Sequence, residues 1–343
     1  MEGFTMSKTV LVTGISGFIG LYCVKELLNK GYNVKGTVRN SSKQIEVINT
    51  FKKNKINIKN LKFKILDLTS DNGWDKAIEG CDFVMHVASP FRIAIPKNED
   101  EMILPAVEGT RRVLEASQKV GVKRIVLTSS IVSMMSSIRR GQFGPKDWTD
   151  INYPNLSTYI KSKTLAERSA WDFFYKNKKK SKMDLVVIAP GGVFGPPLGD
   201  NITCESLNIL SKVLNGKIPM VPDAAFPMVD VRDVAKLHVQ ALTYSKVSGK
   251  RFIASGTNPF SFADVAQFLI SQGYKGPSTK IAPNWFFKFL SLFDREAKGM
   301  LALLGINMIA DNSDTIKTFA WTPIPFEKTL IETANSIKMI QTK

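Results

Sequence analysis

Short apolar stretches alternate in the first half of the chain with longer segments whose apolar residues recur every three or four positions. The apolar stretches are rich in β-branched residues, which is typical of buried parallel strands, and the recurring pattern predicts helices. Strands are expected at residues 9–13, 33–38, 62–66, 83–87, 124–129 and 184–189. Helices are expected at residues 18–30, 75–78 with flanks, 101–120 and 158–175. This order predicts an α/β fold with a doubly wound parallel sheet covered by helices on both faces.

The regular alternation weakens after residue 190, where prolines and glycines interrupt it. We expect residues 1–190 to form the sheet domain, with residues 229–256 returning to it. Residues 191–228 and 257–343 are expected to form a smaller C-terminal lobe that binds a substrate. Charged residues interrupt the apolar segment 285–309, so it lacks the ~20 consecutive apolar residues of a membrane span. It is interpreted as core-facing helices, with an interfacial membrane helix as the less favoured alternative.

The connection between the first strand and the first helix contains three glycines, in the order Gly-Ile-Ser-Gly-Phe-Ile-Gly. Glycine allows a sharp turn and a close approach of the backbone to a pyrophosphate, and the helix N-terminus then faces the phosphate charge. An ordinary strand-to-helix turn is the alternative. The predicted contacts to a dinucleotide are Gly14, Ser16, Gly17, Phe18, Ile19 and Gly20.

The end of the second predicted strand indicates which dinucleotide is bound. NAD sites of this kind carry Asp or Glu there to hold the ribose 2′-hydroxyl, but residues 34–40 contain no acid. Arg39 stands where a guanidinium could hold a 2′-phosphate, and Lys43 could add a second charge. NADP is therefore favoured over NAD, the alternative being a solvated arginine.

Tyrosine and lysine four residues apart lie on one face of a helix, and this spacing occurs at Tyr159/Lys163 and at Tyr175/Lys179. A phenol can donate a proton to a carbonyl oxygen, and a nearby ammonium brings its pKa down from about 10. Tyr159 lies in the first turn of its predicted helix. Tyr175 lies about 24 Å further along, so only the first pair is interpreted as catalytic.

These motifs together resemble the extended short-chain dehydrogenase/reductase superfamily. Residues 37–39 (Thr-Val-Arg), 86–90 (His-Val-Ala-Ser-Pro), 126–130 and 229–235 are similar to its dihydroflavonol reductase and cinnamoyl-CoA reductase branch. The resemblance implies a Rossmann-type sheet and reduction of an aldehyde or ketone to an alcohol with NADPH, with Tyr159 as the proton donor. It further implies Ser130, rather than Ser129 or Ser133, as the hydroxyl that holds the substrate oxygen. The other implied cofactor contacts are Tyr159, Lys163, Asp67, Leu68, Val87, Ala88, Ser89, Pro190, Gly192 and Val193.

Composition narrows the remaining possibilities. The 47 basic and 30 acidic residues give a net charge of +17, but the lysine clusters lack interleaved aromatics, so no specific nucleic acid is expected. Three widely spaced cysteines and two histidines predict no metal site and a reducing compartment. His86, at the end of an apolar strand, is interpreted as a packed core histidine. Without a secretory leader in residues 1–6, we expect a cytoplasmic monomer or homodimer that acts on a small carbonyl compound.

Two other functions fit part of these observations. An NAD-dependent sugar-nucleotide epimerase or dehydratase of the same superfamily would share the fold, but Arg39 and the missing acid argue against it. A non-catalytic NADP-binding sensor would be expected to lack the tyrosine or the lysine, and Tyr159 and Lys163 are both present.

Overall fold

The computed structural model describes residues 7–342, and its centre is a seven-stranded parallel sheet in the order β10-β7-β5-β4-β1-β2-β3. Residues 1–6, in which no leader was predicted, lie outside the described residues. The strands of this sheet are β1 (Thr9–Val12), β2 (Asn33–Val38), β3 (Leu61–Ile65), β4 (Phe83–His86), β5 (Arg124–Thr128), β7 (Asp184–Pro190) and β10 (Lys250–Ala254). All six predicted strands are therefore confirmed to within one residue at each end.

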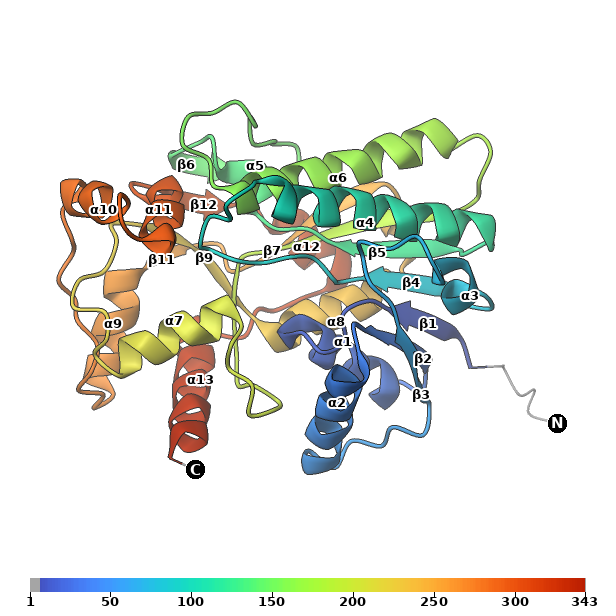
Figure 1. Ribbon diagram of the computed structural model, residues 1–343, viewed down its shortest axis with the longest axis horizontal. Helices are drawn as coiled ribbons and strands as arrows, with labels where there is room; N and C mark the ends of the chain where they lie inside the picture. Colours follow the sequence, from blue (N-terminus) through green and yellow to red (C-terminus); the bar gives the residue numbers. More distant parts are fainter. Residues whose placement is uncertain (1–6, 343) are drawn as a thin grey trace.

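Helices cover both faces of this sheet (Figure 1). One face carries α3 (Trp74–Ile78), α4 (Asp100–Lys119) and α6 (Thr158–Asn177), and the other carries α1 (Phe18–Asn29), α2 (Ser41–Lys53) and α8 (Val231–Ala241). Each face has its own apolar core, one around Leu11, Val84 and Trp171 and the other around Val12, Cys23 and Val234. The sheet is thus doubly wound, as the sequence predicted.

Helix α2 was not predicted from the sequence. Only Val47, Thr50 and Phe51 of its residues are buried, so its apolar face is narrow. Asn40 caps its N-terminus, because the Asn40 side chain accepts a hydrogen bond from the Lys43 N–H at 3.0 Å. The helix is therefore defined by a cap and a few buried residues rather than by a strong periodic pattern.

A second, five-stranded sheet lies beyond the carboxyl ends of the large one. It contains β11 (Pro259–Ser261), β9 (Ala225–Asp230), β12 (Asn307–Ala310) and β6 (Arg140–Phe143), with β8 (Gly192–Phe194) beside β9. The remaining helices are α5 (Val132–Met135), α7 (Glu205–Leu214), α9 (Phe262–Ser271), α10 (Asn284–Leu290), α11 (Arg295–Met300), α12 (Ser313–Phe319) and α13 (Phe326–Gln341), with short 3-10 turns at Ser245–Val247 and Leu301–Leu303.

Two segments differ from the expected division of the chain. β9 pairs with the strands of the small sheet, so residues 229 and 230 do not return to the large sheet; α8 and β10 do. β6 lies within residues 1–190 but pairs with β12 in the small sheet. Both placements depend on pairing between strands that are far apart in sequence, and a local sequence pattern does not predict which strands will pair.

The segment 285–309 is only partly core-facing. Phe287 is buried in it, whereas Trp285, Phe289, Leu292 and Phe293 are exposed. The expectation of core-facing helices was therefore wrong for one face of α10 and the turn after it. None of the helices among residues 7–342 combines the length and the hydrophobicity needed to cross a bilayer.

Candidate active site

The glycine turn after β1 is built for close backbone packing. Gly14 has a φ of +69°, a conformation that glycine adopts without strain. A Cβ atom on Gly20 would lie 2.4 Å from the Gly14 carbonyl oxygen, so α1 can start this near to the turn only with glycine there. Gly17 is the N-cap of α1. The turn thus presents the helix N-terminus at the carboxyl edge of the sheet.

Hydrogen bonds fix this turn to the neighbouring strands. The Thr13 hydroxyl accepts from the Val87 and Ala88 N–H groups at 3.0 and 2.9 Å, and it also contacts His86 Nδ1 at 2.9 Å. The Gly14 N–H donates to the Thr37 hydroxyl at 3.0 Å. Burial lowers the pKa of His86 to about 3, so its imidazole is neutral. His86 is therefore a packed, hydrogen-bonded core histidine, as the sequence predicted.

Ser130, Tyr159 and Lys163 lie together where β5 ends. Tyr159 and Lys163 come from the first turns of α6, which begins after Ser157, whose side chain caps the helix by accepting from the Ile160 N–H. The Ser130 hydroxyl lies beside the Tyr159 phenol and acts to lower the pKa of that phenol. Lys163 Nζ donates to the Thr128 carbonyl oxygen at 3.2 Å. One hydroxyl, one phenol and one amine therefore share a site at the carboxyl end of the sheet.

Burial dominates the titration of these groups. It raises the pKa of Tyr159 to about 12, with the hydrogen bond from Ser130 acting in the opposite direction. It lowers the pKa of Lys163 to about 8, while the Glu167 carboxylate acts to raise it. The sequence predicted that the lysine would lower the pKa of the phenol. In the structure the pKa of Tyr159 is raised instead, because burial has the largest influence on it.

A buried ion pair that the sequence analysis missed lies directly behind this site. Glu167, one helical turn after Lys163, accepts hydrogen bonds from Ser129 Oγ at 2.5 Å, Ser133 Oγ at 2.7 Å and Arg251 Nε at 2.6 Å. Arg251 reaches it from β10, which the sequence could not place beside α6. The sequence contained one sign of this arrangement, because Glu167 follows Lys163 by four residues and the two side chains therefore lie on the same face of the helix.

This ion pair also separates the three candidate serines. Ser129 and Ser133 both donate to Glu167, whereas Ser130 Oγ is directed to Tyr159. Ser133 further bonds to the Ser130 carbonyl oxygen at 2.8 Å, which holds the turn after β5 in place. The arrangement supports Ser130 as the hydroxyl nearest the reacting centre.

The far end of the predicted cofactor site lies after β2 and β3. Arg39 is exposed directly after β2. Hydrogen bonds from Thr69 lower the pKa of Asp67, and the positive charge of Arg39 lowers it further by a smaller amount. The Lys43 ammonium is 2.6 Å from a Glu46 carboxylate. Arg39 is thus the available cation for a 2′-phosphate, while Lys43 already has an acidic partner.

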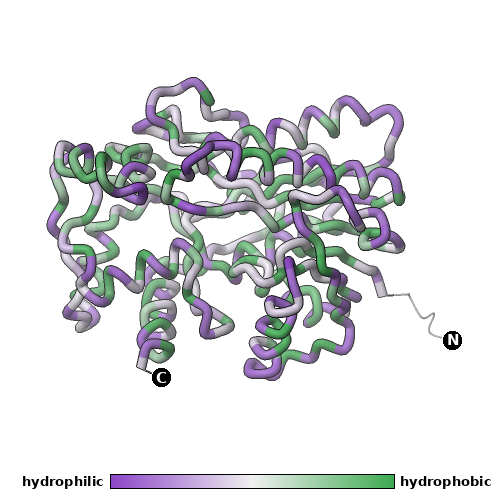
Figure 2. The backbone as a smooth tube through the Cα atoms, viewed as in Figure 1, coloured by the Kyte–Doolittle hydropathy of each residue, from purple (hydrophilic) through white to green (hydrophobic). Residues whose placement is uncertain are grey.

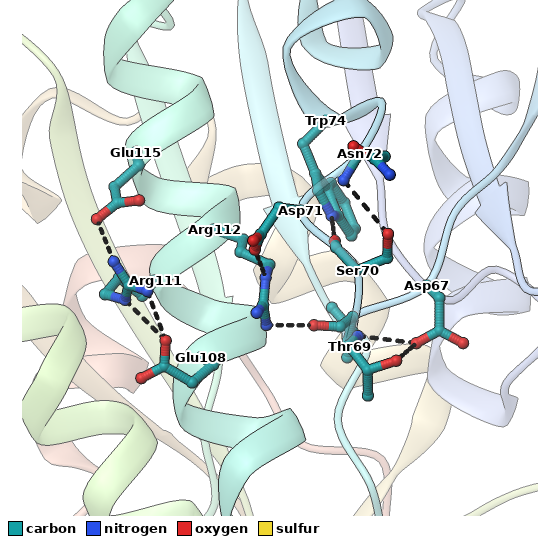
Figure 3. A network of polar contacts seen from close by, with 11 residues as sticks. Asp67, Thr69, Ser70, Asp71, Asn72, Trp74, Glu108, Arg111, Arg112 and Glu115 are labelled. Atoms are coloured by element: carbon teal, nitrogen blue, oxygen red, sulfur yellow. Dashed lines mark hydrogen bonds and ion pairs between the residues drawn. The ribbon is translucent and has the colours of Figure 1, made fainter.

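The loop after β3 is held against α4 (Figure 3). Arg112 Nη1 donates to the Leu68 carbonyl oxygen at 2.8 Å, and its Nε forms an ion pair with Asp71. Trp74 Nε1 donates to the Ser70 carbonyl oxygen at 2.9 Å, which closes the loop on itself. Leu68 and its neighbour Asp67, two of the implied cofactor contacts, are therefore fixed at the carboxyl edge of the sheet.

The predicted residues gather at one edge because the strands that precede them run in parallel. This edge holds the glycine turn after β1 with Ser16, Phe18 and Ile19, Arg39 and Lys43 after β2, Asp67 and Leu68 after β3, Val87, Ala88 and Ser89 after β4, Ser130 after β5, and Pro190, Gly192 and Val193 at the end of β7 and in β8. A concavity beside them is lined by Ser89, Thr128 and Lys163. Tyr175, by contrast, is exposed at the other end of α6, where its ring stacks on Trp171.

Comparison with known proteins gives consistent matches. The profile of the NAD dependent epimerase/dehydratase family matches residues 10–254. Cinnamoyl-CoA reductase 1 of Arabidopsis thaliana is 35% identical over 256 residues, covering 72% of this chain and 70% of the relative. The (2S)-flavan-3-ol-forming anthocyanidin reductase of Vitis vinifera is 32% identical over 290 residues, covering 79% and 83%.

Solved structures resemble the whole chain. Yeast methylglyoxal/isovaleraldehyde reductase Gre2, crystallised with NADPH, superposes with a TM-score of 0.79 at 25% identity, covering 97% of this chain and 99% of the other. Gre2 from Candida albicans in complex with NADPH gives a TM-score of 0.79 at 27% identity with the same coverage.

Proposed function

The chain belongs to the NAD dependent epimerase/dehydratase family, and we propose that it uses NADPH to reduce an aldehyde or ketone to an alcohol, with Tyr159 as the proton donor. The neighbouring side chains of Ser130 and Tyr159, with Lys163 one turn further along α6, carry this proposal. The similar proteins named above are reductases, several of carbonyl compounds, which favours reduction over the epimerase or dehydratase alternative.

The residues of the cofactor site fit NADPH. Glycine at positions 14 and 20 lets the turn pack closely, because a Cβ atom there would clash with Ala88 or with the Gly14 carbonyl oxygen. The N-terminus of α1 is thereby held at the carboxyl edge of the sheet, where its N–H groups suit a pyrophosphate. Arg39 is exposed after β2, and although its charge is felt at Asp67 it forms no ion pair within residues 7–342, so its guanidinium can bind a 2′-phosphate. When bound, NADPH supplies the hydride that reduces the carbonyl carbon.

The side chains of this protein supply the other half of the reaction. Ser130 donates a hydrogen bond to the carbonyl oxygen, which stabilises the negative charge that builds there. Tyr159 transfers its phenolic proton to that oxygen. The Lys163 ammonium then stabilises the phenolate left on Tyr159 until a proton returns from solvent. Glu167 and Arg251 hold the turn after β5 and thereby position Ser130.

The substrate is proposed to be an apolar carbonyl compound. Phe91 packs on Tyr159 at the entrance to the site, and Phe194, Phe226 and Met228 lie in or beside the small sheet that faces it. Phe194 and Met228 are buried in the apolar core of the small lobe, so Phe91 is the apolar side chain that we propose to contact a substrate whose carbonyl group is held by Ser130 and Tyr159.

NADPH oxidation, followed by its absorbance, tests this function. The panel would contain methylglyoxal, isovaleraldehyde, an aromatic aldehyde and a cinnamoyl-CoA ester, each with NADPH and with NADH. Turnover of at least one carbonyl with NADPH, lost in Tyr159→Phe, is the expected result. NADPH binding without turnover of any compound would favour a cofactor sensor, and conversion of sugar nucleotides without net NADPH oxidation would favour an epimerase.

We also propose that the protein acts in the cytoplasm as a monomer or homodimer on a small molecule. Its three cysteines are free, and Cys23 and Cys81 are buried, which suits a reducing compartment. Light scattering coupled to gel filtration measures the oligomeric state, and cell fractionation tests the location.

A further inference from the structure

The surface at α10 exposes an unusual amount of apolar area. Phe293, Leu292 and Trp285 are the three most exposed large hydrophobic side chains within residues 7–342, at 78%, 73% and 68%. Phe289 and Ile281 are exposed beside them in sequence. Other exposed hydrophobic residues are scattered over the chain, which is ordinary for a globular protein, whereas a contiguous group marks a contact surface.

The spacing of these residues places them on one side of a helix. Trp285, Phe289 and Leu292 stand at positions i, i+4 and i+7, and the helical turn continues beyond α10, because the Leu292 and Phe293 N–H groups donate to the Phe289 and Leu290 carbonyls. The rings of Phe289 and Phe293 are in contact, with centroids 5.6 Å apart. Phe287 points the other way and is buried. α10 therefore carries apolar side chains on its exposed face as well as on its buried face.

Cations surround this apolar face. Lys288 lies at i+3 from Trp285, within the same stripe, and Lys280, Arg295 and Lys298 are exposed at its ends. No ion pair among residues 7–342 includes any of these four.

The two acids of the same segment have other partners. Asp294 caps α11 by accepting from the Ala297 N–H at 2.9 Å, and Glu296 pairs with Lys212 at 2.8 Å. The surface thus combines aromatic rings with cations that have no acidic partner in the described chain, on a protein whose net charge is +17.

The surface is well placed for an external partner. In Figure 1, α10 lies at the end of the small lobe opposite β1, β2 and β3, and Figure 2 shows hydrophobic residues mixed with hydrophilic ones at the same edge. We propose that residues 281–298 dock on an anionic lipid surface, with the rings of Trp285, Phe289 and Phe293 in the headgroup region and Lys288 beside the lipid charges.

Physical chemistry favours this occupant over a second copy of the chain. A symmetric dimer through this face would bring the same four cations of both copies together, and their repulsion opposes association. Anionic headgroups neutralise those cations, and tryptophan and phenylalanine are the side chains that interfacial segments insert. The proposal does not depend on the reductase function, because no residue of this surface is assigned to the reaction.

Binding to vesicles tests the proposal. The whole protein is sedimented with phosphatidylcholine vesicles that contain roughly one-third phosphatidylserine, and with phosphatidylcholine alone. Binding to the anionic vesicles that weakens as salt rises is expected, with a loss of about tenfold or more in Phe289→Ser/Phe293→Ser and a clear loss in Lys288→Glu. Met339→Ser, which removes an exposed apolar side chain elsewhere, should bind normally.

The tryptophan fluorescence locates the contact. Trp285 is the one exposed tryptophan of the five, all of which lie in the described part of the chain. Brominated lipid should therefore quench its emission, and Trp285→Phe should abolish the quenching while the vesicles still sediment the protein. No binding to anionic vesicles, or binding that the Phe289/Phe293 variant retains, would overturn the proposal. Dimers that the same double variant dissociates would show that a second copy is the occupant instead.

Discussion

The ring of Phe91 lies against the ring of Tyr159, with the centroids 4.5 Å apart and the planes inclined by 39°. Phe91 comes from the loop after β4 and Tyr159 from the start of α6, so the contact joins two walls of the site. An aromatic pair of this kind contributes about 0.5–1.5 kcal/mol beyond the area it buries. Phe91 therefore covers the proposed proton donor, and we propose that its ring offers an apolar surface to a substrate.

Replacing Phe91 with alanine should weaken the use of an apolar carbonyl substrate. We expect KM to rise by roughly threefold to tenfold, because a ring against which the substrate packs contributes about 0.5–1.5 kcal/mol to its binding, with little change in NADPH affinity. Steady-state kinetics with one accepted carbonyl measure the effect. Phe91→Tyr keeps the ring and should restore KM; an unchanged KM in Phe91→Ala would show that the ring does not border the bound substrate.

Tyr159→Phe removes only the phenolic hydroxyl, so fold and NADPH binding should persist. Carbonyl reduction should fall by ~10²–10⁴-fold, which is the usual contribution of a general acid. Tyr175→Phe is the matched control, since Tyr175 precedes a lysine by four residues but is exposed at the other end of α6. If Tyr159→Phe retains near-normal turnover with the cofactor bound, the proposed proton donor is wrong.

Arg39→Asp should weaken NADPH binding by roughly tenfold or more, because a charge-assisted pair contributes about 1.5–3 kcal/mol and the new carboxylate repels the 2′-phosphate. NADH affinity should change little. Lys43→Ala should have a smaller effect, since the Lys43 ammonium is already paired with Glu46. Fluorescence titration with both cofactors provides the measurement, and equal affinities of the unmodified protein for NADPH and NADH would contradict the role of Arg39.

Glu167→Gln should change the pH dependence of turnover. Burial lowers the pKa of Lys163 to about 8, and the Glu167 carboxylate opposes that effect. Without the carboxylate the pKa of Lys163 falls further, so its ammonium is lost at a lower pH. His86 and His238, the two histidines near Lys163, are held neutral by burial, with pKa values lowered to about 3 and about 4, and the Tyr159 phenol is held protonated by burial. The alkaline limb of the kcat profile should therefore move to lower pH.

Ser133→Ala is the control for this variant. It removes one hydrogen bond to Glu167 but keeps the negative charge of the carboxylate. The effect of that charge on the pKa of Lys163 is therefore retained, and the pH profile of kcat should not shift. A variant Glu167→Gln with reduced turnover and an unshifted profile would mean that Glu167 acts through packing alone. Thermal unfolding of both variants separates a loss of folded protein from a change in titration.

Local sequence patterns were sufficient to predict six of the seven strands of the large sheet and the glycine turn. Strands that are buried on both faces form short apolar runs, and such runs can be recognised in the sequence without knowing which strands lie beside them. The same holds for the spacing of Tyr159 and Lys163, which a single helix determines. The narrow apolar face of α2 gave too weak a periodic signal, so that helix was found only in the structure.

Contacts between distant segments could be decided only by the tertiary structure. The β-branched run at β1, the glycines after it and the four-residue spacing on α6 determined a dinucleotide fold and a candidate proton donor from the sequence alone. The partner of Glu167 is 84 positions away at Arg251, β9 and β6 pair outside the large sheet, and α10 turns its apolar face outward. Pattern within one element reports which residues are apolar, whereas the packing of other elements decides which of them are buried and which charges meet.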